Sequence, residues 1–174
     1  MDVRTLAYDH PHATALIDEL QQFYIAQYGD DDKTQIDPAE FHPPRGQFVV
    51  GYLDGRPVGC GGWRIRDPRD PDLRDGDAEI KRMYVVPSAR GRGHSRVLLA
   101  GIERTARAAG VRRLVLETGA HQPAAIGLYV SNGYVRIGAF GLHRDEPLIR
   151  CFAKVLTTPG PPDRRGLPDQ LSQR

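Results

Sequence analysis

The chain has 174 residues, and its 24 Lys and Arg against 22 Asp and Glu give a formal net charge of +2. This length fits one domain with a sizeable core, and the near-balance of charge gives no reason to expect nucleic acid as a partner. No long apolar stretch follows the amino terminus. We therefore expect no secretion signal, no membrane-spanning segment and a cytoplasmic location.

Hydrophobic spacing and turn signals divide residues 3–156 into eleven elements in the order β-α-α-β-β-β-α-β-α-β-β. They are a strand at 3–8, helices at 12–28 and 37–40, strands at 47–53, 56–65 and 78–86, a helix at 96–109, a strand at 114–118, a helix at 123–132, and strands at 135–137 and 149–155. Asp54-Gly55 is a strong signal for a two-residue hairpin. Alternating strands and helices imply a partly parallel sheet, whereas the hairpin supplies antiparallel neighbours.

Residues 157–174 differ in composition from the preceding domain, 1–156. They contain four prolines and few apolar side chains, so they cannot offset the entropy lost on ordering. We expect a flexible tail. In the alternative, Leu167 and Leu171 dock on a neighbouring subunit, and the sequence leaves open whether the protein is a monomer or a homodimer.

The two cysteines and six histidines give no sign of a metal site. Cys60 and Cys151 are isolated, which is typical of buried free thiols rather than of a zinc site or a disulfide framework. His10 and His12 flank a proline, as in a local turn. We expect no metal.

A glycine-rich turn between a predicted strand and a predicted helix is the most informative stretch of the chain. It consists of Arg90, Gly91, Arg92, Gly93, His94 and Ser95. Glycines allow backbone N–H groups to approach a ligand, and the start of a helix adds unpaired N–H groups, so the turn suits a phosphate or pyrophosphate. The Gly-Lys-Ser/Thr ending of a P-loop is missing. The glycine spacing also disfavours a dinucleotide-binding loop. It does not exclude one, because such a loop is paired with an acidic residue at the end of the next strand, and Glu117 lies near that position.

This run resembles the pyrophosphate loop of the GNAT superfamily of acyl-CoA-dependent N-acyltransferases, with Ser95 where many members have glycine or alanine. Three further regions are similar in the same order: the hairpin ending at 58–63, the strand 114–118 with the residue after it, and the segment 122–134. The resemblance extends from residue 3 to residue 156. It implies an α/β (α+β) fold with a mixed, mostly antiparallel sheet, a splayed central parallel strand pair and helices on both faces.

The resemblance also implies an activity: transfer of an acetyl group from acetyl-CoA to a primary amine by direct attack in a ternary complex. A small-molecule or amino-acid amine is the leading acceptor. Protein amino groups, a non-catalytic acyl-CoA-binding sensor and an unrelated phosphate-binding α/β protein are the alternatives. Family members place the acceptor against their first two helices and the loop between their last strands, which corresponds here to residues 23–41 and 138–147.

Two residues are candidates for catalysis. An alkyl ammonium, with a pKa of about 10.4, must lose a proton before it can attack. Glu79 is the candidate base, directly or through a water, because strand alternation puts it on one face with Lys81, Met83 and Val85. Tyr129 matches the family's helix tyrosine beside the CoA sulfur and is the candidate acid. The structural alternatives are a salt-bridged glutamate and a core tyrosine.

The resemblance assigns the CoA contacts to three regions. The splayed strand would offer the pantetheine arm its backbone at Met83, Tyr84 and Val85. The glycine-rich turn, residues 90–95, would hold the pyrophosphate, and Gln122 and Tyr129 would line the passage of the arm. His121 is a possible relay, although an exposed loop histidine is the commoner case.

Overall fold

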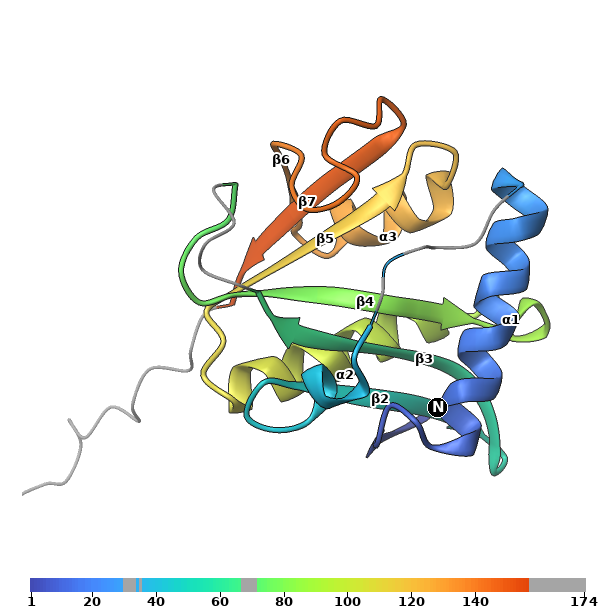
Figure 1. The fold of residues 1–174 in the computed structure, drawn as a ribbon. Coiled ribbons are helices and arrows are strands. Elements are labelled where there is room, and N and C mark those ends of the chain that lie inside the picture. The colour runs from blue at the N-terminus through green and yellow to red at the C-terminus, as the bar shows by residue number, and fades with distance from the viewer. Residues whose placement is uncertain (30–33, 35, 67–71, 157–174) are drawn as a thin grey trace, which may run out of the picture.

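The computed structural model describes residues 1–29, 34, 36–66 and 72–156, and the predicted tail lies outside this set. One seven-stranded sheet has the order β1-β2-β3-β4-β5-β7-β6 (Figure 1). In chain order the elements are β1 (Asp2–Leu6), α1 (Pro11–Tyr28), the 3₁₀ helix η1 (Pro38–Phe41), β2 (Gly46–Leu53), β3 (Arg56–Ile65), β4 (Asp77–Val85), the 3₁₀ helix η2 (Pro87–Ala89), α2 (His94–Ala108), β5 (Arg113–Gly119), α3 (Pro123–Ser131), β6 (Val135–Ile137) and β7 (Ile149–Val155).

The predicted fold class and element order are confirmed, with two local differences. The second predicted helix is a four-residue 3₁₀ turn, although Asp37 caps it as expected by accepting from the Ala39 N–H at 2.9 Å. Helix α2 begins at His94 instead of residue 96, because Gly93 adopts a left-handed conformation as its N-cap. The hairpin turn has positive φ at both Asp54 (48°) and Gly55 (75°), as a type I′ turn requires.

Helices cover both faces of the sheet (Figure 1). On one face α1 contributes Leu16 and Leu20 to a cluster with Phe48 and Tyr84. On the opposite face the cluster includes side chains of α2 and α3 with sheet residues such as Trp63. Successive residues of β2 belong to different clusters, as the two-residue period of a strand predicts.

The parallel pair β4–β5 is short. The strands pair from Asp77 with Arg113 to Glu79 with Val115, and no pairing continues beyond that point. Both strands run on for several residues, so their carboxyl-terminal halves diverge (Figure 1). The expected splay is therefore present, and it leaves one edge of β4 without a neighbouring strand.

A bulge in β4 changes which side chains lie on each face of the strand, so the predicted alternation holds only up to the bulge. Arg82 has a φ of +57°, and the β3–β4 register shifts between Cys60 and Gly62. The extra residue reverses the alternation, so Tyr84 packs on the α1 side and Val85 on the α2 side. The prediction that Met83 and Val85 share a face with Glu79 is wrong for this reason.

Two Gly→Ala substitutions test the packing of this sheet. A Cβ at Gly62 would lie 2.6 Å from the Gln47 carbonyl oxygen, whereas a Cβ at Gly127 in α3 meets nothing within 4 Å. We expect Gly62→Ala to lower the free energy of unfolding by about 1–3 kcal/mol, through overpacking. Gly127→Ala should raise it by up to about 1 kcal/mol through helix propensity. Thermal unfolding measures both, and equal melting temperatures for the two variants would contradict the packing described.

Candidate active site

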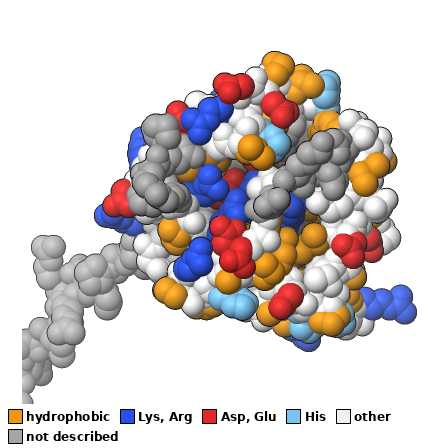
Figure 2. Space-filling view, viewed as in Figure 1, with side chains coloured by type: hydrophobic (Ala, Val, Ile, Leu, Met, Phe, Trp, Pro, Cys, Tyr) orange, Lys and Arg blue, Asp and Glu red, His pale blue; other side chains and the backbone are white. Residues whose placement is uncertain are grey.

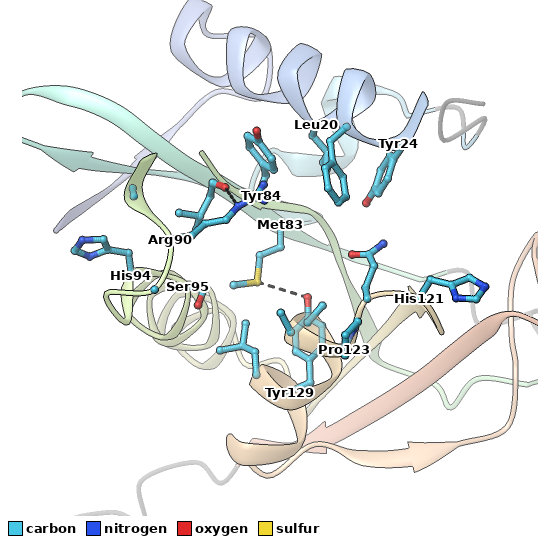
Figure 3. A pocket seen from close by; sticks show the side chains of 18 residues that line it. Leu20, Tyr24, Met83, Tyr84, Arg90, His94, Ser95, His121, Pro123 and Tyr129 are labelled. Atoms are coloured by element: carbon cyan, nitrogen blue, oxygen red, sulfur yellow. Dashed lines mark hydrogen bonds between the residues drawn. The ribbon is translucent and has the colours of Figure 1, made fainter. Parts of the chain in front are cut away.

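A cavity of about 380 Å³ opens where β4 and β5 diverge (Figure 3). Its walls come from α1, β4, the glycine-rich turn, the start of α2 and α3. The predicted CoA contacts that line it are Met83, Tyr84, Val85, Arg90, Gly91, His94, Ser95, Gln122 and Tyr129. Arg92 and Gly93 belong to the same turn but are not part of the lining. His121 does line the cavity, at an exposed position.

The glycine-rich turn has the backbone shape that the sequence suggested. Gly91 and Gly93 have φ values of +74° and +78°, and a Cβ at either would meet nothing within 4 Å. No side chain caps the start of α2, so the first N–H groups of this helix are available to an anion, and the helix dipole favours negative charge there. The turn therefore fits a pyrophosphate.

Arg90 forms part of the cavity wall. Its Nε donates to the Val85 carbonyl oxygen at 2.8 Å, and its guanidinium lies 5.4 Å from the ring centroids of both Phe23 and Tyr84. These contacts fix the side chain between α1 and the end of β4. It can therefore present a preorganised positive charge to an anion in the cavity.

Tyr129 lines the cavity from α3 and is buried. Its ring packs edge-on against Tyr134, and its hydroxyl lies 3.6 Å from the Met83 sulfur, with which it makes the hydrogen bond drawn in Figure 3. Burial raises the pKa of the Tyr129 phenol above its usual value of 10. The hydroxyl thus stays protonated at neutral pH and is suited to donate a proton or a hydrogen bond.

A second cavity, of about 430 Å³, adjoins the first. Both are lined by Tyr24, Met83, Gln122, Ala125 and Tyr129, so they adjoin along these side chains. The second also receives Tyr28 from α1 and His143 and Glu146 from the loop between β6 and β7. Both regions expected to contact the acceptor, 23–41 and 138–147, therefore contribute side chains to this cavity.

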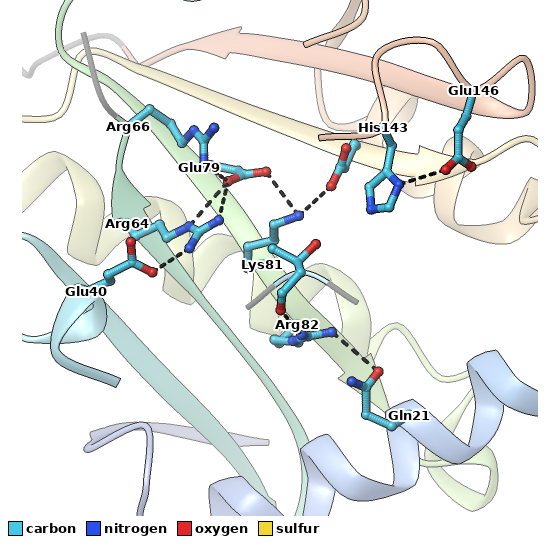
Figure 4. A network of polar contacts seen from close by, with 11 residues as sticks. Gln21, Glu40, Arg64, Arg66, Glu79, Lys81, Arg82, His143 and Glu146 are labelled. Atoms are coloured by element: carbon cyan, nitrogen blue, oxygen red, sulfur yellow. Dashed lines mark hydrogen bonds and ion pairs between the residues drawn. The ribbon is translucent and has the colours of Figure 1, made fainter. Parts of the chain in front are cut away.

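Glu79 lies beside this cavity without lining it. It is 2% exposed, and its Oε2 accepts from Arg64 and Arg66, each at 3.2 Å (Figure 4). Its Oε1 lies 3.2 Å from the Nζ of Lys81. The geometry therefore offers Glu79 no direct contact with a molecule in either cavity.

Lys81 extends this charge network to the second cavity. Its ammonium also donates to Glu117 Oε1, and both Lys81 and Glu117 line that cavity. In Figure 2, charged side chains of both signs gather near the middle of the face above β4. Sequence reasoning gave neither residue a part in catalysis, although Glu117 is a charged side chain directly after the apolar run 114–116.

Comparison with known proteins decides the family. The model of the acetyltransferase (GNAT) family matches residues 13–134. The chain belongs to the GNAT acetyltransferase family. It is accordingly an acyltransferase, as the resemblance implied. An IAA acetyltransferase of Azospirillum brasilense is 37% identical over 155 residues, which cover 87% of this chain and 97% of that relative.

Solved structures agree with the GNAT assignment. A Klebsiella pneumoniae protein assigned as an acyl-CoA N-acyltransferase is 30% identical and superposes with a TM-score of 0.72, covering 90% of this chain and 97% of that one. The PaiA N-acetyltransferase of Thermoplasma acidophilum, solved in complex with coenzyme A, shares the fold at 13% identity and a TM-score of 0.63, with 89% of this chain and 99% of that one covered.

Within the described residues, 1–29, 34, 36–66 and 72–156, the structure shows neither a membrane span nor a metal-binding cluster. None of the helices there combines the length and apolar character needed to cross a bilayer. No set of three or more His, Cys, Asp or Glu side chains in that part of the chain is arranged to hold a metal ion.

A charge placed in the glycine-rich turn tests the pyrophosphate site. Gly93→Asp puts a carboxylate beside the start of α2, and Gly93→Asn puts a neutral side chain of similar shape at the same left-handed position. Because only the first variant repels phosphate, we expect it to weaken acetyl-CoA binding about tenfold more than the second. Titration calorimetry at low salt measures both affinities. Equal affinities in two folded variants would place the pyrophosphate elsewhere.

Proposed function

We propose that this GNAT member transfers an acetyl group from acetyl-CoA to a primary amine of a small molecule or amino acid, by direct attack in a ternary complex. The observation that carries the proposal is the meeting of two cavities at Met83 and Tyr129. One has the glycine turn that suits a pyrophosphate, and the other has charged and aromatic walls. The coenzyme A bound to the Thermoplasma protein and the acetyltransferase name of the Azospirillum relative support it.

In this proposal the splayed part of β4 binds the arm of acetyl-CoA. Beyond Glu79 the edge of β4 that faces β5 has no strand partner, so backbone groups on this edge can bond the pantetheine amides, apart from the Val85 carbonyl oxygen, which accepts from Arg90 Nε. An N–H in the segment Met83–Val85 directed at the acetyl oxygen would stabilise the negative charge that develops there. The pyrophosphate is then held by the backbone of residues 90–95.

Tyr129 is the proposed proton donor to the departing thiolate. The amine nitrogen forms its bond to the acetyl carbon, the tetrahedral adduct collapses, and the carbon–sulfur bond breaks with its electron pair on sulfur. The Tyr129 hydroxyl gives its proton to that sulfur, and the proton lost from the newly formed amide nitrogen restores the phenol. Its buried position beside Met83 keeps the proton in place until the sulfur becomes basic.

In this proposal Glu79 is a positioning residue, which acts on the acceptor cavity through Lys81. It does not line the acceptor cavity, and its ion pair with Lys81 holds the ammonium that in turn bonds Glu117. Of the two routes considered for Glu79, action through an intermediate group fits this geometry, whereas direct contact with the amine does not.

Turnover of the Tyr129→Phe variant tests this function. The full chain is incubated with acetyl-CoA and a panel of primary amines, and free thiol is measured over time. We expect wild-type protein to release thiol only when an acceptor amine is present. Tyr129→Phe should retain acetyl-CoA binding while kcat falls about 10²-fold, since it loses the proton donor.

Tyr134→Phe is the matched control, because its ring packs against Tyr129 but lines neither cavity. A wild-type protein that binds acetyl-CoA and acetylates no amine would favour the sensor alternative. A Tyr129→Phe variant with unchanged kcat would remove Tyr129 from the chemistry.

A further inference from the structure

We infer that the acceptor is a primary monoamine whose remaining part is apolar and about the size of an aromatic ring. We also infer that Glu117 binds its ammonium group and takes its proton. This inference rests on the proposed function and specifies the chemistry of the second cavity. Three features support it. One oxygen of the Glu117 carboxylate has no partner among the described residues, the neighbouring cationic side chains are already bonded to other protein groups, and apolar side chains line much of the cavity.

Glu117 presents a half-satisfied carboxylate to the acceptor cavity. Lys81 donates to its Oε1, whereas its Oε2 is buried and has no hydrogen-bond partner among the described residues. The side chain as a whole is 12% exposed. An unsatisfied buried oxygen on a charged group costs free energy. A bound ammonium is the ligand that removes this cost, because it brings both positive charge and N–H donors.

The cationic side chains of this cavity are already engaged. Lys81 lies between Glu79 and Glu117, and Arg82 donates to Gln21 Oε1 at 3.4 Å and to the Thr34 carbonyl oxygen at 3.1 Å (Figure 4). A carboxylate on the acceptor would compete with these protein groups for the two cations. The cavity therefore disfavours an amino acid.

Among the residues that the structure describes, a second ammonium would find no buried partner equivalent to Glu117. The other carboxylate that these residues contribute to the cavity lining is Glu146, whose side chain is 61% exposed and bonds His143 Nδ1 at 3.0 Å. An ion pair with so exposed a group contributes little, because water screens it. A diamine therefore gains little from its second charge and loses the hydration of that charge.

Aromatic and aliphatic side chains form much of the remaining wall. The rings of Tyr24 and Tyr28 lie 6.2 Å apart on α1, and the Tyr28 hydroxyl is held by Gln122 Nε2 at 2.9 Å. Leu148, 48% exposed, and Ile149 come from the other side of the cavity. These surfaces gain free energy when an apolar body covers them.

The proton transfer balances without another reactant. The ammonium R–NH₃⁺ gives one proton to Glu117 Oε2, which becomes a neutral carboxylic acid, and the amine R–NH₂ attacks the acetyl carbon. Glu117 returns its proton to solvent after the amide leaves. Lys81 bonds the other oxygen, Oε1, so Oε2 is the carboxylate oxygen left to accept the proton.

Two pairs of amines, each pair differing by one charged group, test the acceptor class. 2-Phenylethylamine, phenylalanine and 1,4-diaminobutane are compared by kcat/KM at saturating acetyl-CoA, with butylamine as the one-charge counterpart of the diamine. We expect 2-phenylethylamine to exceed phenylalanine at least tenfold, and butylamine to equal or exceed diaminobutane. Preference for phenylalanine or diaminobutane in an active protein would overturn the inference and leave the proposed function standing.

Glu117→Gln keeps the size of the side chain and removes its charge. We expect a loss of about 10²-fold or more in kcat/KM for 2-phenylethylamine, since a general base contributes this much. The affinity for acetyl-CoA should be unchanged, which also shows that the variant is folded. Asp18→Asn, an exposed change on α1 away from both cavities, is the matched control. Glu117→Gln with near-wild-type kcat/KM would refute the role of Glu117. Absence of turnover with every amine would count against the proposed function itself.

Discussion

The short pairing between β4 and β5 is the constraint on which the rest of this structure depends. Two strands that pair over their full length leave no space between them and no free backbone group on the shared edge. Here pairing ends at Glu79 and Val115, so a gap opens within the sheet. The first cavity occupies this gap, and the glycine-rich turn at the end of β4 and the start of α2 lie at its mouth. Sheet geometry therefore places the first cavity next to the glycine-rich turn.

Buried charge occupies the base of the same opening. Glu79 and Arg64 are nearly inaccessible to water, and Arg64 also pairs with Glu40 of η1. Removing one member of a buried pair typically costs about 3–5 kcal/mol, because the other charge stays buried without a partner. The cluster thus joins β3, β4, β5 and the segment after α1 around the acceptor cavity. Structural and functional demands on these side chains overlap, which is why charged residues are found inside apolar strands.

Much of this arrangement was predictable from local signals. The Asp54-Gly55 hairpin, the Asp37 cap and the apolar run around Leu114 each follow from short-range rules, and they gave the correct order of elements. The glycine-rich turn and the helix carrying Tyr129 were also located correctly, since their signals are contained within a few consecutive residues.

The parts that sequence reasoning missed depend on contacts between distant residues. Arg82 is not a glycine, so nothing local indicates its positive φ, and the bulge it forms moves Val85 to the other face. Glu117 lines the second cavity, and Lys81, 36 positions earlier, bonds one of its oxygens, while the other has no partner among the described residues. Single-strand alternation cannot show which charged side chain reaches the substrate and which one supports it.

Direct transfer between the two adjoining cavities is the central claim of this account. Both cysteines are buried, and burial raises the pKa of each thiol, so neither is suited to carry an acetyl group covalently. Initial rates measured while acetyl-CoA and the amine are varied together test the claim most directly. A ternary complex predicts double-reciprocal lines that intersect. Parallel lines, together with acetylated protein when the amine is omitted, would contradict it.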